Sequence, residues 1–248
     1  MDDIFQYEHP FVCTDAAIFT IKTQKPDSYR KLPGTSVMVL LYKRAMEPYK
    51  DKWCLPGGFL DIDELPEDNI RRKILEKSQI SHCWMEQLYT FCDIGRDPRA
   101  RVLSVSYLGL MNERDSARLE GKATWFSIQA HGDNPPVLIN SGSALSGWDF
   151  GFDHFNILQV AIERLRNKVL YTPIVFHLLP DEFTLTQLQN VYEAILGKKD
   201  QAANFRRKIM NRVRETGGYT SDQGHRPAKL YTKKKEEGRY HEKTADRG

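Results

Sequence analysis

Apolar residues recur along the chain in short runs that have the composition of β-strands. The runs are rich in β-branched and aromatic residues, and they lie at 11–22, 36–44, 86–93, 101–110 and 122–128. Segments that contain proline, glycine and asparagine separate several of them, at 25–34, 95–100 and 134–136. The pattern therefore predicts a sheet of several strands.

Two further segments follow the period of a helix. Between 153 and 167, apolar residues occupy positions 155, 158, 161, 162 and 165. Pro66 suits the first turn of a helix over 66–77, and Ile70 and Ile74 give that helix an apolar edge. Strands bracketed by two helices predict an α/β fold, with a mixed sheet between helical layers.

The pattern changes after Pro173, where signals for a second kind of fold begin. Thr184 and Gln187 have the spacing of a capping box, and Gly197 suits the C-terminal cap of the same helix. A short link leads to a second helix over 201–212, for which Asp200 is the predicted N-cap. The buried residues of the two helices are expected to be Leu188, Tyr192, Ile195, Ala202, Phe205 and Ile209.

Two helices joined by a short turn that contains glycine have helix-turn-helix geometry. Residues 213–232 follow them, with two short strand candidates around a glycine-rich tip. This arrangement predicts a small α+β winged helix-turn-helix at the C-terminal end.

Composition narrows the class of protein. The 248 residues are 40% hydrophobic and 28% charged, as in globular proteins, and no apolar run approaches the roughly 20 residues of a membrane span. The first ten residues lack the layout of a signal peptide, and the four cysteines include no C-x-x-C pair. We therefore expect reduced thiols, no structural zinc and a cytoplasmic location.

Charge is distributed unevenly along the chain. Of the 36 Lys and Arg residues, twelve lie within 198–235, where only Asp200, Glu215 and Asp222 are acidic. A basic segment on an otherwise acidic chain points to a polyanionic partner.

The second helix of the C-terminal unit carries residue types that suit double-stranded DNA. Its outward residues Asn204, Arg207 and Asn211 match the hydrogen-bonding groups of base edges. Arg206 and Lys208 on the helix, with His225 and Arg226 in the wing, are placed for phosphates. A small docking domain and an RNA-binding protein are the alternatives, and the basic helix lacks the aromatic surface that RNA bases stack on.

A spaced motif stands between 57 and 80. Gly58, Glu64, Arg72, Ile74, Glu76 and Ile80 have the spacing of the Nudix box, so this part of the chain resembles the Nudix family. In that family the glutamates of the box hold Mg²⁺ or Mn²⁺ against a nucleoside diphosphate linked to another group. Here Lys73 and Lys77 stand at positions of metal-binding glutamates, and Gln79 stands in place of a glycine.

These substitutions predict a binding site in place of a catalytic one. No catalytic residue and no cofactor are expected from the degenerate box, formed by Glu64, Arg72, Lys73, Glu76 and Lys77. Glu64 and Glu76 are the weak candidates for metal ligands that remain. The 95–107 stretch also resembles ADP-ribose-type Nudix proteins, and the expected effector-binding residues are Gly57, Gly58, Phe59, Glu76, Arg96, Arg99 and Arg101.

The C-terminal unit resembles the winged helix of the Nudix-related transcriptional regulators, through LLPDEFTLTQLQNVYEAILG, NFRRK, TG and GHRPAKLY. With the box, the resemblance covers about 10–232. It implies a homodimeric regulator in which residues 1–170 bind ADP-ribose or a related nucleotide or sugar, and residues 171–234 bind DNA. Residues 235–248 are predicted to be a charged, disordered tail.

The alternative is an active, Mg²⁺-dependent Nudix pyrophosphatase that cleaves ADP-ribose or a similar compound. In that case the basic C-terminal domain would be an accessory that serves dimerisation. Lys73 and Lys77 argue against this alternative, whereas Gly58, Glu64 and Glu76 keep it open.

Overall fold

A mixed β-sheet forms the centre of the computed structural model, which describes residues 6–24, 34–116, 123–129, 137–140, 142–220 and 227–234. In the described part of the chain the strand order is β5-β6-β1-β2-β7-β8-β9, with β3 beside β2 and β4 beside β1. β1 and β6 are parallel, whereas the other pairs are antiparallel. The strands are β1 (Phe11–Gln24), β2 (Gly34–Lys43), β3 (Trp53–Cys54), β4 (Gly57–Phe59), β5 (Trp84–Phe91), β6 (Val102–Leu110), β7 (Ala123–Gln129), β8 (Val137–Asn140) and β9 (Ser143–Leu145).

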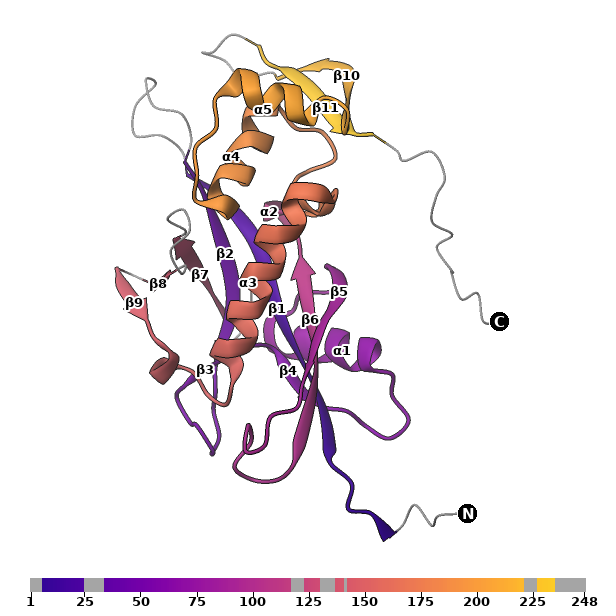
Figure 1. Cartoon of the computed structure of the whole chain (residues 1–248), viewed down its shortest axis with the longest axis vertical. Coiled ribbons are helices and arrows are strands. Elements are labelled where there is room, and N and C mark those ends of the chain that lie inside the picture. The colour runs from indigo at the N-terminus through magenta and orange to yellow at the C-terminus, as the bar shows by residue number, and fades with distance from the viewer. Residues whose placement is uncertain are drawn as a thin grey trace.

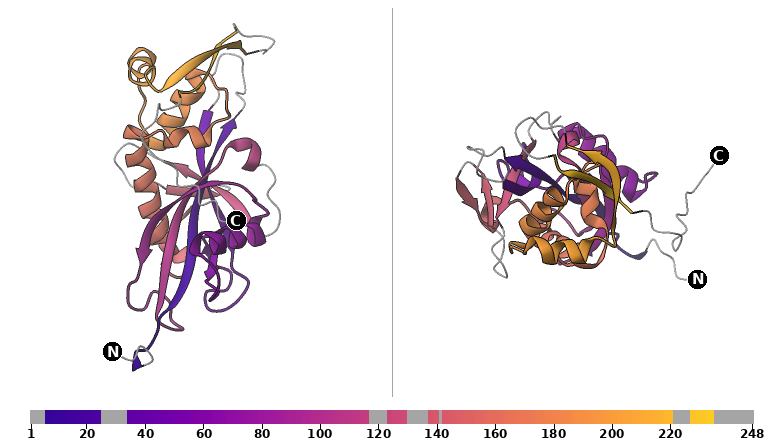
Figure 2. Two further views of the ribbon diagram at one scale, coloured as in Figure 1. Left: turned by 90° about the vertical axis from the view of Figure 1, so that its right-hand side faces the viewer. Right: turned by 90° about the horizontal axis from the view of Figure 1, so that it is seen from above.

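β1 lies at the middle of the sheet and is buried on both faces. Successive side chains of a strand point to opposite faces, and here Ala17 and Phe19 enter one hydrophobic cluster while Ala16 and Ile18 enter another. Helix α1 (Pro66–Ser78) covers the second cluster, and α3 (His154–Tyr171) covers the first. Figures 1 and 2 show the two helices on opposite sides of the sheet, as the sequence predicts.

The remaining elements of this half are short. They are α2 (Glu113–Ser116), the 3₁₀ turn η2 (Gly147–Asp149) and the 3₁₀ turn η3 (Ile174–Leu178). The predicted strands at 11–22, 36–44, 86–93, 101–110 and 122–128 are confirmed with ends shifted by a few residues, whereas β8 and β9 were not predicted. The predicted loop at 25–34 lies outside the described residues except for Gly34, and the predicted turn at 134–136 lies wholly outside them. Among the described helices, none combines the length and the apolar character that a membrane crossing needs.

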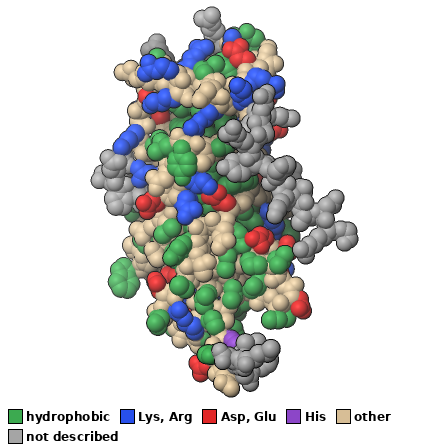
Figure 3. Space-filling model, turned by 45° about the vertical axis from the view of Figure 1, so that its right-hand side comes forward, with side chains coloured by type: hydrophobic (Ala, Val, Ile, Leu, Met, Phe, Trp, Pro, Cys, Tyr) green, Lys and Arg blue, Asp and Glu red, His purple; other side chains and the backbone are tan. Residues whose placement is uncertain are grey.

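The C-terminal unit consists of α4 (Leu185–Leu196), α5 (Ala202–Ile209) and the hairpin of β10 (Val213–Tyr219) and β11 (Lys229–Lys233). The predicted capping box is present, because Gln187 N donates to Thr184 Oγ1 at 3.1 Å and Thr184 N donates to Gln187 Oε1 at 2.8 Å. Gly197 ends α4 in the left-handed conformation, with φ 66°. In Figure 3, Lys and Arg side chains gather at the end of the molecule that this unit forms.

Three predictions about α5 are wrong. The N-cap is Gln201, without a side-chain cap, because the carboxylate of Asp200 instead accepts a bond from Lys208 Nζ at 2.8 Å. Ala202 is exposed, whereas Phe205 and Ile209 are buried as predicted. The helix ends at Ile209 and not at 212, because Val213 already begins β10.

One hydrophobic core joins the two halves. α3 ends at Tyr171, where the boundary between 1–170 and 171–234 was predicted, yet the buried cluster that contains Phe19 continues through Val175 to Leu188 and Tyr231. Phe183 and Tyr231 also exchange backbone hydrogen bonds of 3.0 and 2.8 Å. The C-terminal unit is therefore packed on the sheet and on α3, and it is not suspended on a linker.

The C-terminal caps of α1 and α4 give a matched stability test. Gln79 ends α1 with φ 60°, a conformation that costs a non-glycine residue about 1–2 kcal/mol. After the entropic cost of glycine, Gln79→Gly is expected to raise the free energy of unfolding by about 0.5–1 kcal/mol. Gly197→Ala, which places a Cβ in the same conformation, is expected to lower it by about 1 kcal/mol. Urea denaturation measures both, and a destabilised Gln79→Gly protein would contradict the argument.

Candidate functional site

A cavity of about 350 Å³ opens between α1, β4, the loop before β6 and the start of α3. It contains most of the predicted effector-binding residues: Gly57, Gly58, Phe59, Glu76, Arg96 and Arg99. Lys73 and Lys77 of the degenerate box also line it. The remaining lining residues were not singled out from the sequence: Cys13, Asp15, Tyr42, Arg44, Met46, Asp61, Asp97, Val102, Phe152 and His154.

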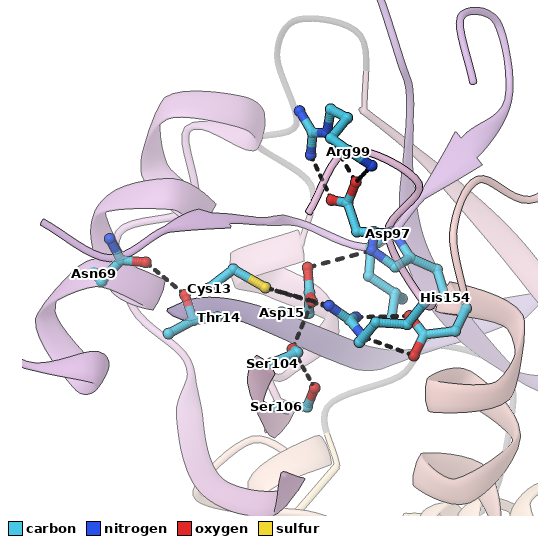
Figure 4. Close-up of polar contacts among 12 residues, drawn as sticks. Cys13, Thr14, Asp15, Asn69, Asp97, Arg99, Ser104, Ser106 and His154 are labelled. Carbon is cyan, nitrogen blue, oxygen red and sulfur yellow. Dashed lines mark hydrogen bonds and ion pairs between the residues drawn. The ribbon is translucent and has the colours of Figure 1, made fainter. Parts of the chain in front are cut away.

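Asp15 on β1 is the buried acid at the floor of this cavity. Its carboxylate accepts a hydrogen bond from Ser104 Oγ at 2.6 Å and lies 3.6 Å from Arg96 Nη2. Arg96 in turn holds Asp153 through two hydrogen bonds, from Nε at 2.9 Å and from Nη2 at 2.6 Å. Figure 4 shows this network, which joins β1, β6, the loop before β6 and the start of α3.

The network gives Arg96 a structural role. Burial alone would lower the pKa of Arg96, but its bonds to Asp153 and the charge of Asp15 raise it, so the guanidinium stays charged. Only 4% of the Arg96 side chain is exposed, and both of its neighbouring carboxylates are already engaged with it. Arg96 therefore holds the cavity floor together through both carboxylates, and its predicted part in effector binding remains a prediction.

His154, the first residue of α3, is the second buried titratable group at the floor. Its Nδ1 accepts a hydrogen bond from the backbone N–H of Leu55 at 3.0 Å, and its Nε2 lies 3.4 Å from Asp15 Oδ1. Burial lowers the pKa of His154, so the ring is neutral with its proton on Nε2, facing Asp15. This ring ties β3, β4 and α3 to the central strand.

Arg99 is the predicted arginine that remains at the mouth of the cavity. Its guanidinium pairs with Asp97 at 2.6 Å and lies 5.3 Å from the Phe59 ring centroid and 5.4 Å from that of Phe152. With 42% of its side chain exposed, it can reach a ligand. Arg101 does not line the cavity, because adjacent extended residues point to opposite sides and Val102 takes the inward position.

Gly57 is required by close packing of β4 on β1. A Cβ atom at this position would lie 2.2 Å from Asp15 Oδ1 and 2.3 Å from the Thr14 carbonyl oxygen. The glycine therefore lets the backbone of β4 pack directly against β1 and the carboxylate of Asp15 at the cavity floor.

The carboxylates that remain in the box are occupied by Arg72. Its guanidinium donates to Glu64 at 2.7 and 2.8 Å, to Glu76 at 3.0 Å and to Asp61 at 2.7 Å. The hydrogen bonds from Arg72 and then from Asn69 lower the pKa of Glu64 to about 2. Glu64 and Glu76 thus form an ion-paired network around Arg72.

A divalent metal does not fit these residues. Within the described parts of the chain, no three Asp, Glu, His or Cys side chains gather where they could hold a metal ion. Lys73 Nζ lies 3.3 Å from Glu76 Oε2, in the place where a Nudix enzyme would need a carboxylate. The predicted absence of a cofactor remains a prediction.

The surface of α5 and of the β10–β11 hairpin forms the second candidate site. Arg206, Arg207, Lys208 and Asn211 are exposed, as predicted, and Asn204 is half-buried. Arg207 Nη2 donates to Asn204 Oδ1 at 3.3 Å, so these two residues present a joint polar edge. His225 and Arg226 lie outside the described residues.

Comparisons with known proteins bear on both sites. The Nudix domain family matches residues 31–141, and the NrtR DNA-binding winged helix domain matches residues 175–232. The "ADPR responsive transcriptional repressor NtrR" of Acinetobacter baylyi is 34% identical over 230 residues, which are 91% of this chain and 82% of that protein. The chain belongs to the NrtR family of Nudix-related transcriptional regulators.

Solved structures agree with this NrtR assignment. Shewanella oneidensis NrtR in complex with a 27mer DNA matches with a TM-score of 0.69 and 31% identity, over 90% of this chain and 93% of that one. A MutT/nudix family protein from Enterococcus faecalis matches with a TM-score of 0.73 and 25% identity, over 94% of this chain and 90% of that one. Both matches run through the Nudix domain and the winged helix, so the NrtR architecture extends over the whole described fold.

Two arginines beside the cavity of this NrtR-family chain differ in burial, and their contributions to stability should differ accordingly. Arg96→Met would leave Asp15 and Asp153 without their shared cation, and it is expected to lower the free energy of unfolding by about 3–5 kcal/mol. Arg99→Met is expected to cost about 1 kcal/mol or less, because the backbone N–H of residue 99 still donates to Asp97.

Thermal or urea unfolding of the two variants measures this difference. Arg96→Lys keeps the charge but cannot form the bidentate hydrogen bonds, so its free energy of unfolding should lie between those of Arg96→Met and wild type. Equal losses for Arg96→Met and Arg99→Met would contradict the assignment of Arg96 to the cavity floor.

Proposed function

We propose that this chain is a DNA-binding transcriptional regulator whose Nudix domain senses ADP-ribose or a related metabolite. The observation that carries the proposal is the joining, in one folded unit, of a cation-lined cavity and a winged helix with a basic face. The A. baylyi relative is named as an ADPR-responsive repressor, and the S. oneidensis relative was crystallised with DNA. We place the protein in the bacterial cytoplasm, where such a regulator meets DNA.

The cavity suits a nucleoside diphosphate attached to a sugar. Its volume of about 350 Å³ lies in the range of small-molecule sites. Arg99 at the mouth can pair with phosphate, and the rings of Phe59 and Phe152 beside it offer apolar surface to a base or a ribose. Gly57 and Gly58 let Asp15 and the stem of Lys73 pack directly on the backbone of the box at the cavity wall.

A hydrolase is the second candidate, and the geometry of the box disfavours it. Catalysis of the Nudix type needs carboxylates free to hold a metal, but Glu64 and Glu76 are bonded to Arg72. Mg²⁺ would be a cofactor of this protein only if it were a hydrolase. Robust Mg²⁺-dependent cleavage of ADP-ribose by wild type, abolished by Glu76→Gln, would favour it over the regulator.

The winged helix is placed to bind double-stranded DNA. α5 is the second helix of the helix-turn-helix, the element that enters the major groove in this class of domain, and the β10–β11 hairpin lies beside it. A homodimer would present two copies of α5 to half-sites about 34–36 Å apart, or multiples of that distance.

Helix α3 links the cavity to the winged helix. Asp153 and His154 at its start belong to the cavity floor. At its other end, Arg212 from the segment after α5 donates to the carbonyl oxygens of Leu170 at 3.1 Å and Thr172 at 3.3 Å. A helix of 18 residues spans about 27 Å, so α3 joins two distant sites as one rigid element.

The proposal is tested by a gel-shift with DNA from the protein's own locus, with and without ADP-ribose. We expect binding to a site in that DNA about 10³-fold or more tighter than to unrelated DNA at the same salt concentration. Added ADP-ribose, but not AMP, should change that affinity. Equal binding to both DNAs would contradict the role as a regulator.

Two neighbouring cations on α5 separate base reading from phosphate binding. Arg207→Ala is expected to cost about 1–3 kcal/mol on the cognate site and to relax the base preference there. Lys208→Ala should weaken all sequences alike and reduce the salt slope by about 1. Fluorescence anisotropy over a range of salt concentrations measures both effects. If Arg207→Ala weakened the binding of all DNA sequences equally, Arg207 would not be a residue that recognises bases.

A further inference from the structure

The two lysines of the degenerate box both line the cavity, and they are held there in different ways. The stem of Lys73 crosses Gly58, where a Cβ atom would lie 2.7 Å from Lys73 Cε. The ammonium group of Lys77 lies 4.0 Å from the centroid of the Tyr42 ring. Two positive charges thus project from one face of α1 into the site.

Lys77 lacks an anionic partner among the described residues, where no carboxylate lies within ion-pair distance of its ammonium group. The cavity acid Asp15 is already engaged with Arg96, His154 and Ser104. Burial, and then the positive charges of Lys73 and Arg44, lower the pKa of Lys77.

Arg44 adds a third cation to the same wall. Its guanidinium donates to the carbonyl oxygens of Pro48 and Glu47 and lies 5.0 Å from the Phe152 ring centroid. Lys73 is paired with Glu76 at 3.3 Å, whereas neither Lys77 nor Arg44 has a carboxylate within ion-pair distance among the described residues. Half-buried cations that lack a counter-ion are unfavourable, and an anion placed beside them removes that cost.

We infer that Lys73 and Lys77 bind the diphosphate of the effector directly and supply the charge that a divalent cation supplies in a Nudix enzyme. This inference rests on the proposed function, in which the effector is ADP-ribose or a close relative. Ligand binding is therefore independent of metal. Ammonium groups neutralise phosphate oxygens but do not generate a metal-bound hydroxide, so the diphosphate is held without being cut.

The inference is tested by calorimetry of the full chain with ADP-ribose, in excess EDTA and in excess Mg²⁺. Wild type is expected to bind with the same Kd in both. Lys77→Met, which keeps an apolar stem on Tyr42, should weaken binding by about 10- to 100-fold, and Lys77→Arg should restore most of it. Arg71→Met is the matched control, because Arg71 lies on the same helix, is exposed and does not line the cavity; it should bind as wild type does.

The double variant Lys73→Glu with Lys77→Glu reverses the charge. It should lose binding in EDTA and recover it in Mg²⁺, because added carboxylates can hold the cation. Two results would overturn the inference without affecting the proposed regulatory function. One is wild-type binding that requires Mg²⁺, and the other is unchanged binding by Lys77→Met in EDTA. Failure of wild type to bind ADP-ribose in either condition would overturn the proposed effector as well.

Discussion

The ion pairs of Arg96 with Asp15 and Asp153 are the interaction on which the candidate site depends. They join the central strand to the start of α3 across the cavity floor. Arg96 stands 57 positions before Asp153 in the chain and 81 positions after Asp15. Arg96 and Asp15 are buried and Asp153 is partly buried, and buried charges are stable only while each has its partner, so the geometry of the floor is fixed as a unit. The start of α3 is thereby held at the cavity, and any ligand that displaces the floor also acts on α3.

The C-terminal end of α3 contacts the winged helix, so α3 connects the cavity floor to the DNA-binding unit. Arg212 caps α3 from the winged helix, and Arg166 on α3 donates to the carbonyl oxygen of Leu196 at the end of α4. The hydrophobic core also continues from the sheet into the winged helix without a break. Such a unit transmits a change at one end to the other through packed side chains, because close-packed interiors shift between discrete arrangements and deform little. Lys73 and Lys77, which replace the carboxylates of a Nudix enzyme, place positive charge in the cavity, as the proposed binding of a diphosphate needs.

Local patterns in the sequence predicted the elements whose stability is local. The capping box at Thr184 and the glycine cap at 197 depend on neighbouring residues, and the structure has them. The role of Arg96 could not be predicted in this way, since its partner Asp153 is 57 residues distant in sequence. The prediction that Asp200 caps α5 failed for a related reason, because the carboxylate of Asp200 instead accepts a hydrogen bond from Lys208. A buried acid in the apolar run of β1, Asp15, was the one signal of the cavity floor that the sequence offered.

The central claim is that the effector cavity and the DNA-binding face belong to one coupled unit. Coupling between two sites is reciprocal, so a ligand that changes DNA affinity must have its own affinity changed by DNA by the same factor. The direct measurement is the Kd of ADP-ribose by calorimetry, for the free protein and for the protein saturated with its operator DNA. The account predicts two values that differ by about 5- to 150-fold. Identical values in the presence and absence of DNA would contradict it.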